Sequence, residues 1–245
     1  MLVELSRGEV VESVHQVSAV VAGSDGPSLV WGDARSPVIA RSALKFIQAL
    51  PLLRSGAADR FGVSDDELVL ACSSHSGEPE HVGAIQAWLN RIGLDEAALE
   101  CGPDRPIGGQ ALIDHHRRCQ EPAQVLNCCS GKHTGFLTVA RHLGVDHAGY
   151  IEPDHPVQRL VTEAVEQLTG YPVADQQPGR DGCGIPTHGI PLAALAGGMS
   201  TLTNPAALDP RTRSAAARLI EAAPGREFWI SGTGRHEMML GRDAT

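Results

Sequence analysis

Apolar residues near the start of the chain follow the pattern of β-strands. Residues 10–22 are rich in valine, residues 23–27 supply glycine, serine, aspartate and proline, and residues 28–31 are again mostly apolar. This order predicts two strands joined as a hairpin. A helix is then predicted to begin near Ser42 and to end near Pro51, because a proline ring is not tolerated inside a helix.

Helical patterns dominate the rest of the chain. Residues 68–72 are a continuous apolar run that predicts a buried strand, followed by a polar loop over residues 73–78. Apolar residues in 79–92 recur at close to the helical period. Further helices are predicted over residues 110–119, 134–143, 156–168, 191–202 and 210–222. Strands in front and helices behind them predict an α+β fold of mixed α/β layers. With no repeat or linker, we expect residues 1–245 to form a single domain.

Composition and charge narrow the class of protein. The net charge is −9 and no basic cluster occurs, which argues against nucleic acid and anionic membranes as partners. No apolar run reaches the ~20 residues of a membrane span. The N-terminus lacks the apolar core of a secretory signal, and the six cysteines are too few and too irregularly spaced for a disulfide scaffold. We therefore expect a reduced, cytoplasmic protein.

Ser42 and Lys45 are the first candidates for catalysis. A spacing of three places both side chains on one helical face, where they can meet. A lysine at a helix N-terminus and away from water can lose its proton and act as a base, which would make the serine a nucleophile. Ser-x-x-Lys also arises often by chance, and the alternative is a surface lysine one turn from a helix cap.

The polar loop over residues 73–78 has two interpretations. After a buried strand and before a helix, it would lie where ligands commonly bind. The alternative is a capping turn, in which Ser76 caps the next helix and Glu78 opposes its dipole.

Cysteines in glycine-bordered turns are candidate metal ligands. Cys129 and Lys132, with Cys183 further along the chain, could bind zinc and leave a fourth position open. Lysine is a rare ligand because its nitrogen must be neutral, so His133 is the conventional competitor. The alternative is that the cysteines are simply buried. Asp181 is either a substrate-facing acid or part of an Asx turn.

Motifs in a fixed order connect these candidates. They are Arg41-Ser42-x-x-Lys45, Gln48-Ala49-Leu50-Pro51, Ser74-His75-Ser76-Gly77-Glu78-Pro79-Glu80-His81, Cys101-Gly102-Pro103, Cys129-Ser130-Gly131-Lys132-His133, His155-Pro156-x-Gln158 and Asp181-Gly182-Cys183-Gly184-x-Pro186. Together they resemble the asparaginase II family, the zinc-containing type of L-asparaginase whose fold is similar to serine β-lactamases and glutaminases. The resemblance covers nearly the whole chain.

The resemblance implies a fold, a reaction and a set of residues. The fold would be an antiparallel sheet flanked by helices, and the reaction would convert L-asparagine to L-aspartate and ammonia through an acyl-enzyme. Ser42 would be the nucleophile, Lys45 its base and Ser74 a second active-site serine. The residues lining the substrate pocket would be Arg41, His133 and Asp181. The ligands of one Zn²⁺ would be Cys129, Lys132 and Cys183. The family also implies a homodimer.

The sequence departs from the family pattern at three places. Asp104 stands where the family usually has histidine, and Cys128 stands where a second asparagine is common. Family members also continue with a segment that carries the lysine partner of the second serine, whereas no lysine follows Lys132 here. We therefore expect Ser74 to lack this particular lysine partner within residues 1–245, and the chain alone to be impaired in activity and stability.

Two alternatives to an asparaginase stay open. A related serine acyl hydrolase, such as a glutaminase, would differ in pocket length, and one methylene is worth only about 1–3 kcal/mol of discrimination. The other alternative is a non-catalytic protein that binds zinc or an amino acid, although such a protein has no need of the Ser42–Lys45 pair.

Overall fold

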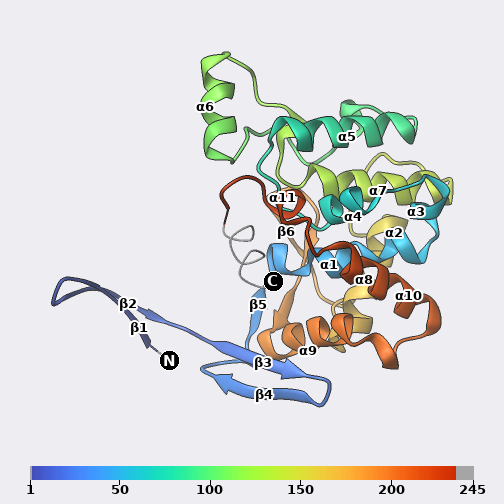
Figure 1. Ribbon diagram of the computed structural model, residues 1–245. Coiled ribbons are helices and arrows are strands. Elements are labelled where there is room, and N and C mark those ends of the chain that lie inside the picture. The colour runs from blue at the N-terminus through green and yellow to red at the C-terminus, as the bar shows by residue number, and fades with distance from the viewer. Residues whose placement is uncertain (1, 236–245) are drawn as a thin grey trace.

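Short antiparallel strands meet a body of helices in the computed structural model, which describes residues 2–235 (Figure 1). This arrangement confirms the α+β class. None of the described helices is both long and apolar enough to cross a membrane.

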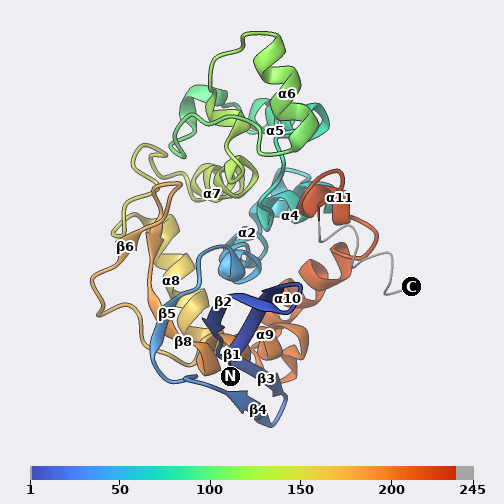
Figure 2. The same cartoon turned by 90° about the vertical axis from the view of Figure 1, so that its left-hand side faces the viewer.

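The strands pair two by two. The pairs are β1 (Leu2–Arg7) with β2 (Val10–Gln16), β3 (Ala19–Gly23) with β4 (Gly26–Trp31), β5 (Pro37–Ile39) with β8 (Gly189–Pro191), and β6 (Gly179–Arg180) with β7 (Pro186–Thr187). The β3–β4 hairpin confirms the predicted turn, but the valine-rich segment over residues 10–22 is divided between β2 and β3, and β2 pairs with β1 instead. The β1–β2 pair forms an arm that projects from the body (Figure 1). β5 and β8, distant in sequence, run side by side (Figure 2). Where the resemblance implied one antiparallel sheet, the described strands form four separate ones, because β5 pairs with β8 and not with the hairpins.

Helices form the body of the molecule and enclose its core. In chain order they are α1 (Lys45–Gln48), α2 (Leu50–Arg54), α3 (Ala57–Arg60), α4 (Asp65–Ala71), α5 (Pro79–Arg91), α6 (Gly109–Arg117), α7 (Ser130–Leu143), α8 (Pro156–Thr169), α9 (Leu192–Thr203), α10 (Pro210–Ala222) and α11 (Glu227–Ile230). The helices predicted from residue 79 onward are all present. Proline opens α5, α8 and α10, where its missing N–H leaves no bond unmade. The helix predicted from Ser42 is present as a 3-10 turn over Arg41–Leu44 followed by α1, which ends at Gln48. Pro51 lies just beyond, in the first turn of α2.

Residues 68–72 are not a strand but belong to the end of α4 and its cap, which corrects the prediction. A capping box of Ser64 and Glu67 starts this helix, because each side chain accepts a hydrogen bond from the other's backbone N–H. Leu68 and Leu70 are fully buried. A short helix buried on nearly all sides has no polar face, so its apolar run cannot be told from a buried strand. The polar loop therefore follows a helix.

α7 packs directly against α4 at Gly131. A Cβ atom added there would lie 2.5 Å from the carbonyl oxygen of Leu70, so only glycine permits this approach. The first turn of α7 thereby lies beside the end of α4, which leads into Ser73 and Ser74. Two segments with candidate chemistry are brought together by this single close contact.

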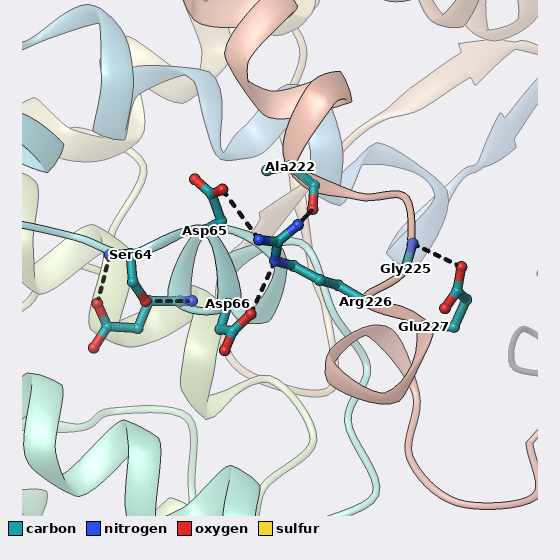
Figure 3. A network of polar contacts seen from close by, with 8 residues as sticks. Ser64, Asp65, Asp66, Ala222, Gly225, Arg226 and Glu227 are labelled. Atoms are coloured by element: carbon teal, nitrogen blue, oxygen red, sulfur yellow. Dashed lines mark hydrogen bonds and ion pairs between the residues drawn. The ribbon is translucent and has the colours of Figure 1, made fainter.

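Arg226 fastens the other end of α4 to the C-terminal helices (Figure 3). Its guanidinium donates to Asp66 at 2.9 Å, to Asp65 at 3.2 Å and to the carbonyl oxygen of Ala222 at 3.1 Å. The chain then continues through α11, where the carbonyl oxygen of Ile230 accepts the backbone N–H of Ser74 at 3.2 Å. The segment after α10 therefore borders the loop that carries Ser74.

Candidate active site

Ser42, Lys45 and Ser74 lie in contact. Lys45 opens α1 and is only 1% exposed. Its Nζ donates to the carbonyl oxygen of Ser73 and, at 2.8 Å, to Oγ of Ser74. Oγ of Ser74 lies 3.1 Å from Oγ of Ser42, which is exposed. A continuous line of polar atoms therefore runs from a buried amine to an exposed hydroxyl.

This contact refines two expectations. The sequence has no lysine after Lys132 to serve as the second lysine of the family pattern, and it is Lys45 that hydrogen-bonds Ser74, because the end of α4 carries the Ser73–Ser74 segment over the start of α1. The amine hydrogen-bonds Ser74, and Ser74 in turn hydrogen-bonds Ser42. Spacing along one helical face does not predict such an order, since the intervening hydroxyl comes from another segment.

Arg41 and Asp181 form an ion pair beside this line of hydroxyls. Nε of Arg41 donates to Oδ1 of Asp181 at 3.1 Å, and the same oxygen accepts the N–H of Gly182 at 2.7 Å. The bond to Gly182 reaches only the next residue, whereas an Asx turn bonds two residues on, so what these contacts support is a carboxylate that faces a charged group. Arg41 has φ of +46°, in the left-handed region that non-glycine residues rarely adopt. Strain of this kind gathers at functional sites.

A second cluster contains the thiols. Nζ of Lys132 lies 3.2 Å from Sγ of Cys183, and Sγ of Cys129 lies 3.9 Å from Sγ of Cys128. Hydrogen bonds from Cys128 and Cys183, together with the nearby Lys132 charge, hold the pKa of Cys129 below its usual range. The hydrogen bond to Cys129, together with burial, raises the pKa of Cys183. The structure thus brings together the three expected metal ligands, with one of them favoured as a thiolate.

No three His, Cys, Asp or Glu side chains within residues 2–235 gather closely enough to hold a metal ion. A metal at the thiols would therefore need Lys132 as its third ligand. Cys128, one of the departures from the family pattern, directs its sulfur toward Cys129. Asp104, a second departure from that pattern, lies in an isolated β-bridge with Ala123.

Comparison of the sequence with known protein families gives a match over nearly its whole length. The family model described as L-asparaginase II matches residues 3–245. The chain belongs to the L-asparaginase II family. No curated protein matches it.

In this L-asparaginase II chain His133 is buried in the first turn of α7. Its Nδ1 lies 2.6 Å from the hydroxyl of Tyr150, and its Nε2 is buried without a hydrogen-bond partner among the described residues. Burial, with the nearby Lys132 charge, lowers the pKa of His133 well below its usual value. Sequence reasoning missed Tyr150, which lies in the irregular segment between α7 and α8. The one available signal was that aromatic residues are scarce and only two tyrosines occur.

In this family member, His75 lies between the serine cluster (Ser42, Lys45 and Ser74) and the thiol cluster (Cys129, Lys132 and Cys183). Its Nδ1 accepts the N–H of Gly77 at 3.1 Å, and its Nε2 lies 2.9 Å from Oγ of Ser130. The backbone N–H of His75 donates to the carbonyl oxygen of Cys128 at 3.2 Å. Burial, followed by the charges of His81 and Lys45, lowers the pKa of His75 to about 3. A neutral imidazole therefore joins the two segments.

The capping turn predicted after Ser74 is present with a different cap. Glu78, not Ser76, is the N-cap of α5, and it forms a capping box with His81. Ser76 is buried and donates to the carbonyl oxygen of Ser231. Glu78 also accepts the backbone N–H of Thr233 at 2.7 Å. This loop therefore holds the segment after α11 against the candidate site.

Proposed function

We propose that this chain hydrolyses the side-chain amide of L-asparagine to L-aspartate and ammonia. The observation that carries the proposal is the contact from exposed Ser42 through Ser74 to buried Lys45. Membership of the L-asparaginase II family supports the same reaction. The proposal includes a single domain whose fold is similar to serine β-lactamases and glutaminases.

Ser42 is the nucleophile in this proposal, because it is the exposed end of the chain of contacts. As its Oγ attacks the amide carbonyl carbon, its proton moves to Ser74, and the proton of Ser74 moves to neutral Lys45. Returning that proton to the amide nitrogen releases ammonia and leaves an acyl-enzyme on Ser42. Water then attacks the ester carbon and gives its proton to Ser74, whose own proton moves to Lys45. The proton returns through Ser74 to Oγ of Ser42 as the ester bond breaks and aspartate leaves.

Charges beside Ser42 suit an amino-acid substrate. A guanidinium pairs well with a carboxylate, and a carboxylate pairs well with an ammonium group. Arg41 directly precedes the nucleophile in the sequence, and its guanidinium pairs with Asp181 at 3.1 Å while staying largely exposed. Arg41 would therefore bind the α-carboxylate and Asp181 the α-ammonium group.

The thiol cluster fits zinc by its donor chemistry. Lys132 is 2% exposed, and its Nζ contacts the sulfur atom of Cys183, which is a poor partner for an ammonium group but a natural neighbour for a metal-bound amine. Cys129, Lys132 and Cys183 would hold the ion. When bound, zinc would supply a fixed positive charge that orients the substrate.

A homodimer in the cytoplasm completes the proposal. Val21, Leu29 and Trp31 share one face of the β3–β4 hairpin and are 49%, 52% and 42% exposed. Exposed apolar faces of this kind mark interaction surfaces, which supports association with a second copy. The free state of all six cysteines supports a reducing compartment.

Ammonia release from L-asparagine and L-glutamine by the purified chain tests the reaction. We expect release from asparagine that disappears in Ser42→Ala and persists in Ser24→Ala, a matched change in the exposed turn between β3 and β4. Faster release from glutamine would identify a glutaminase-like enzyme. A folded protein that binds zinc and is silent on both substrates would overturn the hydrolase and leave a binding protein.

A further inference from the structure

Tyr150 is a buried residue whose hydroxyl lies between two nitrogen atoms. The backbone N–H of Glu100 donates to its oxygen at 2.9 Å, and Nδ1 of His133 lies 2.6 Å from the same oxygen. The backbone around the tyrosine is held as well, since the side-chain amide of Gln158 donates to the carbonyl oxygen of Tyr150 at 3.0 Å. The phenol ring itself is fully buried.

The donors and acceptors around this hydroxyl indicate which ring nitrogen of His133 carries the proton. A backbone N–H can only donate, so the oxygen of Tyr150 accepts from Glu100 and keeps one proton to give away. If that proton goes to Nδ1 of His133, only the Nε2–H group remains unpaired. The opposite tautomer would leave two buried groups unpaired, namely the phenol proton and the Nε2 lone pair. Buried polar groups are nearly always paired, so the first arrangement is favoured.

The unpaired Nε2–H group points to a missing acceptor. It is on the side of the ring away from Tyr150. The backbone N–H of His133 donates to the carbonyl oxygen of Cys129 at 3.0 Å, and His133 directly follows Lys132, so the residue borders the thiol cluster of the candidate site. A buried N–H donor with no partner among the described residues is satisfied when a ligand brings an oxygen atom to it.

We propose that Tyr150 is a positioning residue, which holds His133 with its proton on Nε2 so that His133 donates to an oxygen atom of the amino-acid substrate. This inference rests on the proposed amide hydrolysis. The phenol of Tyr150 stays protonated in this role, in keeping with the way burial raises its pKa. A substrate oxygen atom then accepts from an N–H donor whose direction is already fixed.

The tautomer can be measured without any substrate. In a chain labelled with ¹⁵N-histidine, NMR distinguishes protonated from unprotonated ring nitrogens, and His133→Gln identifies the signals of His133 by their loss. We expect Nε2 to be protonated and Nδ1 to be unprotonated in the unmodified chain. A proton on Nδ1 would overturn the proposal, whatever the enzyme's activity.

Tyr150→Phe tests the consequence, with Tyr171→Phe, at the chain's other tyrosine, as the matched control. Loss of one fixed hydrogen bond should raise KM for asparagine about tenfold while kcat changes less. His133 of Tyr150→Phe should also show a changed tautomer ratio. Equal KM values for the two folded variants would overturn the proposal. If the unmodified chain releases no ammonia, the proposed function fails, and the NMR result still decides the tautomer separately.

Discussion

The two lysines of the chain are both buried, but in different surroundings. Lys45 meets oxygen atoms, the carbonyl of Ser73 and the hydroxyl of Ser74. Lys132 meets the sulfur of Cys183 at 3.2 Å. Oxygen acceptors can satisfy an ammonium group, and a hydroxyl can also return a proton to a neutral amine. Sulfur is a weak acceptor, so the second lysine lacks such partners.

The difference separates proton transfer from ligand binding. A buried amine beside hydroxyls is suited to accept and return a proton, whereas a buried amine beside thiols is suited to bind a soft cation. Of the twenty lysine and arginine residues in the chain, the other eighteen are arginines. Arginine cannot lose its proton in proteins. In the proposed function both positions require a neutral amine, which lysine can provide and arginine cannot.

Replacing each lysine with methionine should have the largest effect and tests whether the two lysines differ in role. Lys45→Met keeps the volume of the side chain and removes the base, so kcat for asparagine should fall about 10³-fold, within the range for acid–base groups. Lys132→Met leaves the hydroxyls in contact, so its main effect should be loss of bound zinc. Steady-state kinetics and metal analysis of both variants are the measurements. Equal losses of kcat with unchanged zinc would show that the two clusters are not different in kind.

Cys183→Ala tests whether the cluster around Lys132 binds zinc. Removing a ligand should weaken zinc binding about 100-fold, at the upper end of what loss of a supporting partner costs. Cys72→Ala is the matched control, because Cys72 is also a buried thiol but donates to the carbonyl oxygen of Leu68 at 3.4 Å. Competition with a chelator measures both affinities. Zinc held equally well by both variants would remove Cys183 from the ligand set.

Lowering the pH should decrease the free energy of unfolding through His75, which lies between the two clusters. Its folded pKa of about 3 is below the ordinary value of 6.5, so the unfolded chain binds the proton more readily. The stability that depends on neutral His75 is complete above pH 6.5 and is lost as the pH falls toward 3. The slope is about 1.4 kcal/mol per pH unit for one group. Burial lowers the pKa of His81 in the same direction.

Urea unfolding at pH 7, 6 and 5 measures this loss. His75→Gln should flatten the dependence of the unfolding free energy on pH by about 1.4 kcal/mol per unit below pH 6. His15→Gln, on the exposed arm, is the control and should leave the slope unchanged. An identical slope in the two variants would mean that His75 is not held neutral by the fold.

Local signals in the sequence predicted the helices better than the contacts between them. Pro79, Pro156 and Pro210 mark helix starts because of what proline lacks, and that signal is independent of tertiary structure. α4 was mistaken for a strand because burial on nearly all sides removes the helical period. The close approach at Gly131 depends on Leu70, in a different helix, and no local pattern contains it.

The candidate site could be predicted only in part for the same reason. Spacing alone suggested that Ser42 and Lys45 meet directly, whereas the hydroxyl of Ser74 links them from another segment. The resemblance to the family supplied the membership of each cluster. Tyr150 carries no motif of its own, and its role depends on a contact with His133 that only the folded chain contains.

The smallest expected effect concerns the charged border of the serine cluster. Asp181→Asn keeps an oxygen to accept the N–H of Gly182 and removes the charge that faces Arg41. Because the Arg41 side chain is 67% exposed, the ion pair should contribute less than about 1 kcal/mol to stability. KM for asparagine should nevertheless rise about tenfold, since one charged contact to the substrate is lost.

Glu152→Gln is the matched control for this last prediction. It removes a comparable exposed ion pair with Arg180, at 2.7 Å, and should leave KM unchanged. Thermal unfolding and steady-state kinetics of both variants separate the two effects. If Asp181→Asn binds asparagine as well as Glu152→Gln does, Asp181 only shapes its own turn. The charged border would then consist of Arg41 alone, and recognition of the α-ammonium group would have to come from the thiol side of the site.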